Sequence, residues 1–147
     1  VIFMAGGSGL SSPRSMVVDM LENDADSRKI TLVYGARNRA ELYYHDLFVD
    51  LAGKYPNFRY VPALNEPTPA CDWSGFKGFV HDAAADALGN DFRGHKAYLC
   101  GPPVMIEACI RALMKGRLFE RDIYTEKFVT AGDGAQALAR SPLFRNI

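Results

Sequence analysis

The sequence is poor in the residues that build disulfide-bonded and metal-bound proteins. It has three cysteines, Cys71, Cys100 and Cys109, and neither their odd number nor their spacing suggests a disulfide framework or a zinc site. The three histidines are scattered, with no ligand-type residue at metal spacing, so we interpret them as ordinary surface or core residues. This use of cysteine is typical of a reducing, cytoplasmic setting.

The sequence also lacks an excess of charge of either sign. Its 17 basic and 17 acidic side chains cancel, which argues against a surface for nucleic acid or for an anionic membrane. No apolar run approaches the length of a membrane span, and no signal-peptide pattern is present. With 147 residues, 48% hydrophobic and 23% charged, the composition predicts one globular domain with a core of its own.

The first residues present predict a strand, a glycine turn and a helix. Residues 1–5 are apolar and predict a buried strand, and Gly6, Gly7 and Gly9 predict a tight turn. The apolar face of the following helix is predicted at Met16, Val17, Met20 and Leu21. Glycines let backbone N–H groups approach a ligand closely, and a helix begins directly after this turn. Such a turn is therefore expected to bind a phosphate group. Because the sequence opens directly on a buried strand, we expect that Val1 is a point of truncation and that further residues preceded it.

The glycine turn matches the dinucleotide-binding fingerprint only in part. Gly7 and Gly9 satisfy its first two glycines, whereas Ser12 stands where a third glycine or alanine would help the helix pack. No Gly-Lys-Ser/Thr follows, so the turn is not a P-loop. Taken alone, the turn equally fits a simple connection between a strand and a helix.

Strands and helices alternate along the rest of the chain. Further strands are predicted at 30–34, 58–64, 97–100 and 123–128, with helices at 40–54, 80–88 and 104–114 and a loop around 67–75. This alternation predicts an α/β fold, a doubly wound five-stranded parallel sheet. Right-handed crossovers give the strand order 3-2-1-4-5. The ligand site is then expected between the carboxyl ends of the first and fourth strands.

A second motif follows the fourth predicted strand, at residues 100–105. If the predicted topology holds, this Cys-Gly-Pro-Pro-Val-Met turn lies beside the glycine turn, and the two form the walls of one crevice. Gly101 leaves room for a flat ring, and Pro102 and Pro103 suit a helix start. Cys100 is expected to project into the crevice as a soft, polarisable group, or else to be a small buried hydrophobe. No partner at a known spacing supports a role as nucleophile.

Four segments together resemble the pyridine-nucleotide half of the ferredoxin reductase superfamily, and within it the reductase components of multicomponent phenol hydroxylases. They are AGGSGLSSP, YGARNRAELYY, YLCGPPVMI and the late EKF. The resemblance implies a Rossmann-like domain over 1–129 with a tail over 130–147. The pattern of the tail is weak, and its apolar residues Leu143, Phe144 and Ile147 are those expected to pack against the body. It also implies flavin-binding and [2Fe-2S] ferredoxin-like domains that this chain does not contain.

The implied function is electron transfer from NADH through FAD and a [2Fe-2S] centre to a di-iron oxygenase that hydroxylates phenol or a related aromatic. Alternatives from other classes are a non-catalytic nucleotide-binding module, a docking module for an oxygenase or flavin subunit, and an NADPH-dependent flavin reductase of the same superfamily.

The resemblance also implies the site residues. Cofactor-binding residues from the two turns are Gly6, Gly7, Ser8, Gly9, Leu10, Gly101, Pro102 and Met105. Cys100 is implied as a catalytic residue where nicotinamide meets the flavin. Glu126 is implied there for orientation or charge balance, although a strand-end carboxylate paired with Lys127 is an alternative. Phe128 is implied to lie near the flavin, although it equally fits the core.

The choice of nucleotide depends on the end of the second strand. A carboxylate such as Glu41 accepts from a ribose 2′-hydroxyl and repels a 2′-phosphate, whereas Arg37 or Arg39 can clamp that phosphate. The resemblance favours NADH, with Arg37 expected to stack on adenine or ribose. Glu41 also fits a simple position at the opening of the next helix.

Overall fold

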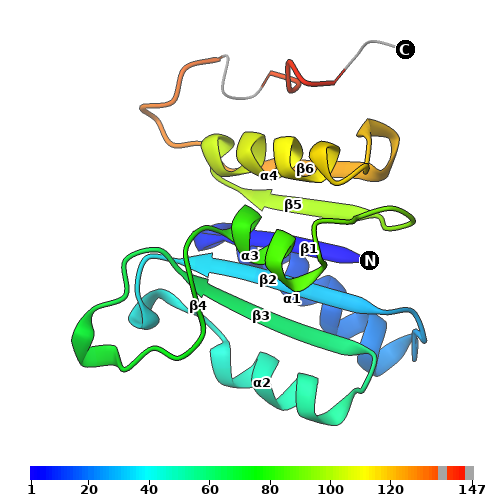
Figure 1. The fold of residues 1–147 in the computed structure, drawn as a ribbon, viewed down its shortest axis with the longest axis vertical. Helices are drawn as coiled ribbons and strands as arrows, with labels where there is room; N and C mark the ends of the chain where they lie inside the picture. The colour runs from blue at the N-terminus through cyan, green and yellow to red at the C-terminus, as the bar shows by residue number, and fades with distance from the viewer. Residues whose placement is uncertain (136–138, 145–147) are drawn as a thin grey trace.

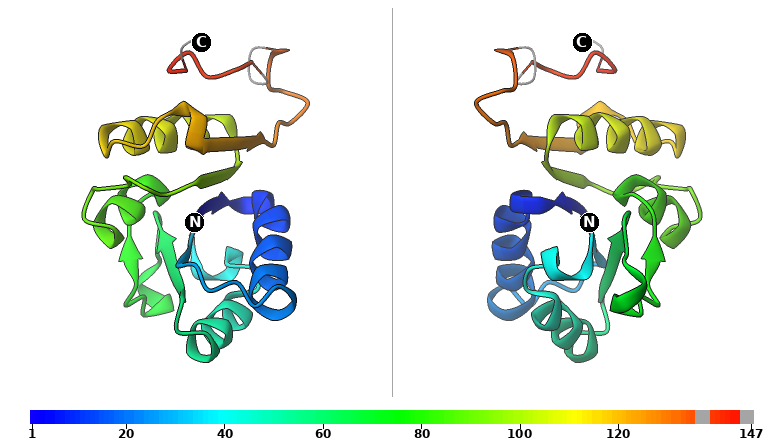
Figure 2. Two further views of the ribbon diagram at one scale, coloured as in Figure 1. Left: turned by 90° about the vertical axis from the view of Figure 1, so that its right-hand side faces the viewer. Right: turned by 90° about the vertical axis from the view of Figure 1, so that its left-hand side faces the viewer.

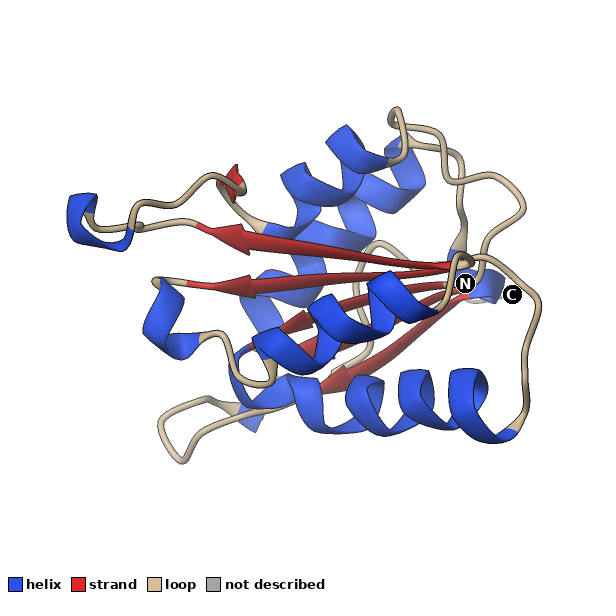
Figure 3. Cartoon of the chain, turned by 90° about the horizontal axis from the view of Figure 1, so that it is seen from below, coloured by secondary structure: helices blue, strands red, loops and turns tan. Residues whose placement is uncertain are grey.

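The computed structural model describes residues 1–135 and 139–144, which form a parallel sheet between two layers of helices (Figures 1 and 3). The strands are β1 (Ile2–Gly6), β2 (Ile30–Ala36), β3 (Phe58–Leu64), β4 (Phe76–Lys77), β5 (Ala97–Gly101) and β6 (Ile123–Lys127). The α-helices are α1 (Ser11–Val18), α2 (His45–Lys54), α3 (Val80–Ala87) and α4 (Pro103–Lys115).

The six strands of the described residues run in the order β4-β3-β2-β1-β5-β6, and every neighbouring pair is parallel. β1 is central, with Ile2 opposite Thr31 of β2 on one side and Ala97 of β5 on the other. This confirms the predicted doubly wound order for the five longer strands. It also confirms that the topological switch point lies between β1 and β5.

The predicted five-stranded sheet missed the edge strand β4. β4 has two residues, and it continues the pairing of β3 by placing Phe76 opposite Ala63 and Lys77 opposite Leu64. Glycines flank it at 75 and 78 and prolines precede it, so its local pattern is that of a loop. Its pairing therefore comes from the neighbouring strand rather than from its own propensity.

Two hydrophobic cores fill the space between the sheet and the helices. α3 and α4 pack on one face, where Met4, Val33, Leu99 and Ile110 are fully buried. α1 and α2 pack on the other face around core residues such as Phe48. The side views show the helices on both sides of the sheet (Figure 2). Both faces of each central strand are therefore covered, as a parallel sheet requires.

The first helix differs from its predicted apolar face. α1 begins at Ser11 and continues into a π-helical turn, Asp19–Asn23. Val17 and Leu21 are buried as predicted, whereas Met16 is 37% exposed. The buried stripe begins earlier, at Leu10, because the helix starts directly after the glycine turn.

The predicted helix over 40–54 is shorter in the structure. A separate 3₁₀ turn covers Arg39–Glu41, and α2 itself begins at His45. Tyr44 has the left-handed backbone angle φ of 57°, which no helical run can include. This break leaves Glu41 in the 3₁₀ turn between β2 and α2.

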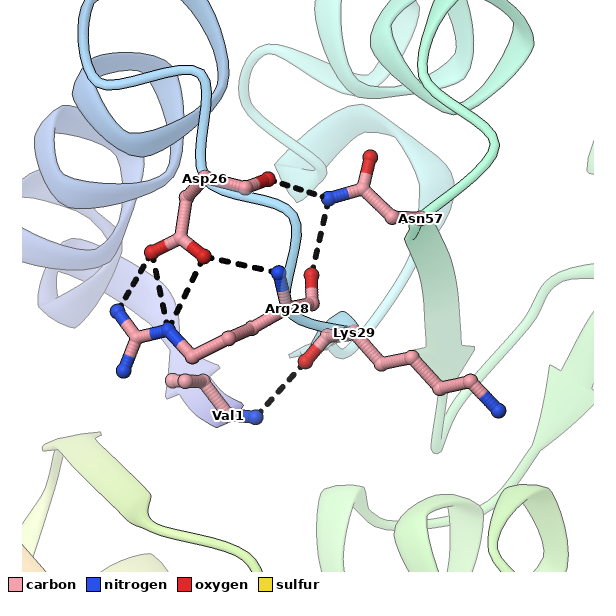
Figure 4. A network of polar contacts seen from close by, with 5 residues as sticks. All are labelled: Val1, Asp26, Arg28, Lys29 and Asn57. Carbon is pink, nitrogen blue, oxygen red and sulfur yellow. Dashed lines mark hydrogen bonds and ion pairs between the residues drawn. The ribbon is translucent and has the colours of Figure 1, made fainter.

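Polar contacts hold together the amino edge of the sheet (Figure 4). The amino group of Val1 donates to the carbonyl of Lys29 over 2.8 Å. Asn57 Nδ2 donates to the carbonyls of Asp26 and Arg28, at 2.7 and 2.9 Å. The Arg28 guanidinium pairs with the Asp26 carboxylate and lowers the pKa of that carboxyl to about 2. The starts of β1, β2 and β3 are thereby tied together at the end opposite to the glycine turn.

The last described segment lies along the outer edge formed by α4 and β6 (Figure 1). Leu143 and Phe144 are partly buried against the α3–α4 core, as expected for the tail. Ser141 Oγ donates to Glu107 Oε2 of α4 over 2.7 Å. Ile147, the third tail residue expected to pack, lies outside the described residues. No helix among residues 1–135 and 139–144 has the length and apolarity needed to cross a membrane.

Candidate functional site

The two motifs meet at the carboxyl ends of β1 and β5. A Cβ atom placed on Gly9 would lie 2.4 Å from the carbonyl oxygen of Cys100 and 2.7 Å from the Cα of Gly101. Real Cβ atoms do not approach backbone so closely, so residue 9 must be glycine for the turns to touch. The expectation that the glycine turn and the Cys-Gly-Pro-Pro turn lie side by side is confirmed.

The first turn is shaped by its backbone. Gly7–Leu10 form one 3₁₀ turn between β1 and α1, and Gly7 has the left-handed φ of 56°. A side chain at this position would be strained, although no atom within 4 Å would obstruct it. The turn therefore presents bare backbone toward the space in front of it.

A cavity of about 760 Å³ opens at this edge, between the amino ends of α3 and α4. Its volume is in the range that holds small-molecule ligands and cofactors. Its wall is mostly apolar, with a few polar groups. The lining residues are Gly6, Gly7, Ser8, Gly35, Ala36, Arg37, Glu41, Tyr43, Asn65, Gly78, Phe79, Val80, His81, Pro102, Val104, Met105 and Ala108.

Seven of the predicted binding residues line this cavity. They are Gly6, Gly7, Ser8, Arg37, Glu41, Pro102 and Met105. The structure thus brings together the glycine turn, the second turn and the end of β2, which lie far apart in sequence. Arg37 and Glu41 form an ion pair with 2.7 Å between Nη2 and Oε1. Glu41 therefore belongs to the cavity wall and not to the start of a helix.

The sequence analysis missed a third wall, formed by residues 78–81. Phe79 is 57% exposed, and its ring stacks on His81 with 5.8 Å between centroids and 7° between planes. His81 is a partly exposed residue that also lines the cavity. The sequence contains a signal for this wall, because Gly78 precedes α3 in the same way as the glycines of the first turn precede α1. It was overlooked because residues 76–79, between the predicted loop and the predicted helix, were given no assignment.

The other six predicted site residues do not line the cavity: Gly9, Leu10, Cys100, Gly101, Glu126 and Phe128. Leu10 is 3% exposed and packs in the α1–α2 core. Gly9 and Gly101 form the contact between the two turns. The amide of Phe128 donates to the carbonyl of Gly101 over 2.9 Å, which holds this half-buried residue next to the second turn.

Cys100 does not line this cavity, and its 5% exposure agrees with the second alternative considered from the sequence, a small buried residue. Side chains alternate along β5, so Leu99 enters the α3–α4 core while Cys100 lies on the α1 side of the sheet. There its thiol donates to Glu126 Oε2 over 3.8 Å. Ser12 Oγ of α1 donates to the same oxygen over 2.9 Å. The two residues that the resemblance implied as catalytic therefore contact each other, and Ser12 joins them.

Burial, with a smaller contribution from the nearby Glu126 carboxylate, raises the pKa of Cys100 to about 12. The thiol is therefore protonated at neutral pH, which disfavours nucleophilic chemistry. Glu126 is not paired with Lys127, the alternative considered from the sequence. Lys127 Nζ donates instead to Glu107 Oε1 and to the carbonyl of Ala139, at 3.3 and 2.8 Å.

The cavity suits a dinucleotide. Bare backbone at Gly6 and Gly7 can donate N–H groups to a pyrophosphate, and α1 begins directly after this turn. Apolar walls at Phe79, Val80 and Met105 can cover flat rings. A parallel sheet with a glycine turn and such a cavity at its switch point defines a Rossmann-type nucleotide-binding domain.

Comparison with known families agrees with this assignment. The sequence model of the oxidoreductase NAD-binding domain family matches residues 3–111. The chain therefore belongs to this family.

Three relatives illustrate the similarity. The chain is 61% identical over its full length to the reductase component DmpP of phenol 2-monooxygenase from Pseudomonas sp. (strain CF600). It is 60% identical over 99% of its length to the phenol hydroxylase P5 protein of Acinetobacter pittii (strain PHEA-2). It spans 41% of the length of each. The crystal structure of the Amycolatopsis cytochrome P450 reductase GcoB matches with a TM-score of 0.76 and 33% identity, over 89% of this chain and 38% of that one.

Proposed function

We propose that this chain binds NADH and acts as the nucleotide-binding domain of a flavin- and iron–sulfur-dependent oxidoreductase. The observation that carries the proposal is the backbone contact between the two turns beside a cavity of about 760 Å³. That arrangement gives the groove two walls. The glycine turn suits the pyrophosphate of a dinucleotide, and the opposite, apolar wall suits its flat aromatic rings. Membership of the oxidoreductase NAD-binding domain family supports NAD as the ligand class.

The residues of the cavity have distinct proposed roles. Backbone amides of Gly7 and Ser8, with the Ser8 hydroxyl, bind the pyrophosphate by charge-assisted hydrogen bonds. Arg37 and Glu41 contact the adenosine ribose, because they lie at the end of the strand next to the glycine turn. Pro102 and Met105 form the opposite wall.

Cys100 and Glu126 are proposed to act where nicotinamide meets the flavin, with Phe128 nearby. Their hydrogen bond and the bond from Ser12 fix their side chains relative to the second turn. Since hydride transfer depends on close and aligned donor and acceptor, their proposed role is positioning and charge balance. NADH, when bound, supplies the hydride that reduces the flavin.

The wider proposal concerns the protein in which this domain works. The 60% and 61% identity to two phenol hydroxylase reductase proteins supports electron transfer through FAD and [2Fe-2S] to a di-iron oxygenase component that acts on phenol or a related aromatic. The partners are then a flavin-binding domain, a ferredoxin-like domain and that oxygenase. The cytoplasmic setting stays a prediction from the cysteine pattern.

A calorimetric titration of the chain with NADH tests the binding proposal. Val104 is 83% exposed and lines the cavity, so Val104→Trp should fill the site without disturbing the core. Val49→Trp on α2 is the matched control, because Val49 is exposed but does not line the cavity. We expect NADH to bind to the wild-type chain and to Val49→Trp, and at least about tenfold more weakly to Val104→Trp. No binding to the wild-type chain would contradict the proposal.

The redox proposal needs a second experiment. The chain alone should reduce added flavin or dye little or not at all. When joined to a flavin-binding domain and a ferredoxin-like domain, it should oxidise NADH and reduce cytochrome c. Binding of NADH without any such reduction in the joined protein would leave the non-catalytic nucleotide-binding module as the better description.

A further inference from the structure

The wall of the cavity has few side chains that can carry a charge. Among the described residues that line it, Arg37, Glu41 and His81 are the ones that are charged or change charge between pH 5 and 8. Arg37 Nη2 donates to Glu41 Oε1 over 2.7 Å, and Nε donates to Oε2 over 3.2 Å. This bidentate pair compensates the guanidinium. His81 is therefore the lining residue that can still present a positive charge to a ligand.

The fold places His81 near the glycine turn. Gly6 of β1 is paired with Gly35 of β2, and neighbouring strands lie about 4.8 Å apart. A Cβ atom on Gly35 would overlap Cγ2 of Val80, so the first residue of α3 packs directly on this glycine. The first turn of α3, which contains His81, thus begins about one strand spacing from the turn proposed to bind the pyrophosphate.

The imidazole of His81 is oriented by its neighbours on α3. Its ring stacks on that of Phe79 with 7° between the planes. Its Nε2 lies 3.6 Å from Asp82 Oδ2, which is too far for a hydrogen bond. The side chain of Asp82 is 59% exposed, so water screens this pair. The charge of a protonated His81 is thus less compensated than that of Arg37.

The elements packed around α3 present few other charges to this wall. From β2 and the turn after it come Arg37 and Glu41, which are paired. Lys77 of β4 is exposed and does not line the cavity. Beside His81 on its own helix lies Asp82. The lining residues of α4 are uncharged: Val104, Met105 and Ala108. Within the described part of the chain, protonation of His81 therefore adds one positive charge that no bidentate partner compensates.

We propose that His81, in its protonated form, binds the pyrophosphate of the coenzyme, so that the affinity of the site for NADH falls as the pH rises. This deepens the proposed function and rests on it. An imidazolium N–H that donates to a phosphate oxygen makes a charge-assisted hydrogen bond. A bound anion in turn favours the charged form of the imidazole. Ligand and proton therefore strengthen each other's binding, and both are favoured at low pH.

Variants of His81 should fold as the wild type does. The side chain is 28% exposed and lies in the first turn of α3. His81→Gln removes the charge at every pH, whereas His81→Lys keeps it across the neutral range. His95→Gln is the matched control, because His95 is also partly exposed but precedes β5 and does not line the cavity. Unfolding midpoints, measured by circular dichroism at each pH, verify folding before any titration.

The test is calorimetric titration of the chain with freshly dissolved NADH at about pH 6 and about pH 8, in phosphate-free buffers of equal, low ionic strength. The wild type and His95→Gln should bind NADH about three- to tenfold more tightly at the lower pH. In His81→Gln and in His81→Lys, the two affinities should agree within about twofold, because neither side chain changes its charge over this range.

Proton uptake gives a second readout. Titrations at about pH 7 in two buffers with different ionisation enthalpies measure the protons taken up when NADH binds. The wild type should take up a fraction of a proton per NADH, and His81→Gln should take up none. Equal uptake by the two chains would contradict the role of His81.

The outcomes separate this inference from the proposed function. A wild-type affinity that differs less than about twofold between the two pH values would overturn the inference. So would a pH dependence that persists in His81→Gln or, if that variant does not fold, in His81→Lys. In each case NADH binding by the wild type would leave the proposed function standing. A wild-type chain that binds NADH at neither pH would overturn both.

Discussion

Ser12 Oγ donates a 2.9 Å hydrogen bond to Glu126 Oε2, which joins the first turn of α1 to the last strand of the sheet across 114 residues of sequence. We expect the two residues to be energetically coupled. In a double-mutant cycle with Ser12→Ala and Glu126→Ala, measured by urea unfolding, the coupling should be about 0.5–1 kcal/mol. Ser15→Ala, which removes a bond within α1 only, is the control. A coupling indistinguishable from zero would contradict the contact.

Gly9→Ala should destabilise the protein by about 2 kcal/mol or more, because the new methyl group overlaps the backbone of Cys100. Gly53→Ala on α2 is the matched control, since a Cβ there meets nothing within 4 Å. That control should be neutral or stabilising by up to about 1 kcal/mol. Urea unfolding measures both, and equal midpoints for the two variants would refute the contact between the turns.

The three cysteines should differ in reactivity. Burial raises the pKa of Cys100 and of Cys109 to about 12, so at pH 8 about one thiol in ten thousand is ionised. Native labelling with iodoacetamide, read by mass spectrometry, should modify the half-exposed Cys71 first. Urea should make all three reactive. Equal labelling of Cys100 and Cys71 in the folded chain would be the contrary result.

The same shifts predict how stability changes with pH. Both thiols ionise near pH 9 in the unfolded chain and near pH 12 in the folded one. Their neutral burial therefore stabilises the fold fully below about pH 9, and this contribution declines as the pH rises toward 12. The urea midpoint should fall over this range, and it should fall less in Cys109→Ala than in the wild type.

Phe79→Ala should weaken NADH binding about three- to tenfold, because it removes an aromatic wall of the cavity. Phe119→Ala is the control: Phe119 is 55% exposed, close to the 57% of Phe79, but it does not line the cavity. Calorimetry with NADH compares the two. Equal NADH affinities of the Phe79→Ala and Phe119→Ala variants would disprove the role of Phe79.

Cys100→Ala is best measured in a protein that joins this chain to a flavin-binding domain. Stopped-flow reduction of the flavin should slow more than about tenfold, whereas the NADH affinity should change less than about threefold. Cys71→Ala should change neither. A parallel loss of rate and affinity would argue against a positioning role for Cys100.

The sequence predicted the sheet order because its five longer strands carry clear apolar runs and its connections obey one handedness. It missed β4, whose two residues pair with the last two residues of β3 and are too few to form an apolar pattern of their own. It also placed the start of the second helix too early, since nothing in the local pattern predicts the left-handed backbone of Tyr44.

The site was predicted where glycine and proline turns carry it, at Gly6, Gly7, Ser8, Pro102 and Met105. Two features needed coordinates. The direction of the Cys100 side chain depends on the strand register, and a shift of one residue reverses it. The hydrogen bond between Ser12 and Glu126 depends on the distance between elements at opposite ends of the chain.

Because Gly9 has no side chain, the two turns are in direct backbone contact. The backbone of Gly9 lies so close to the carbonyl of Cys100 that not even a methyl group fits between them. The glycine turn and the Cys-Gly-Pro-Pro turn therefore cannot move closer together. The glycine turn and the end of β5 are therefore packed as one unit, which the hydrogen bonds of Cys100 and Ser12 to Glu126 extend to β6.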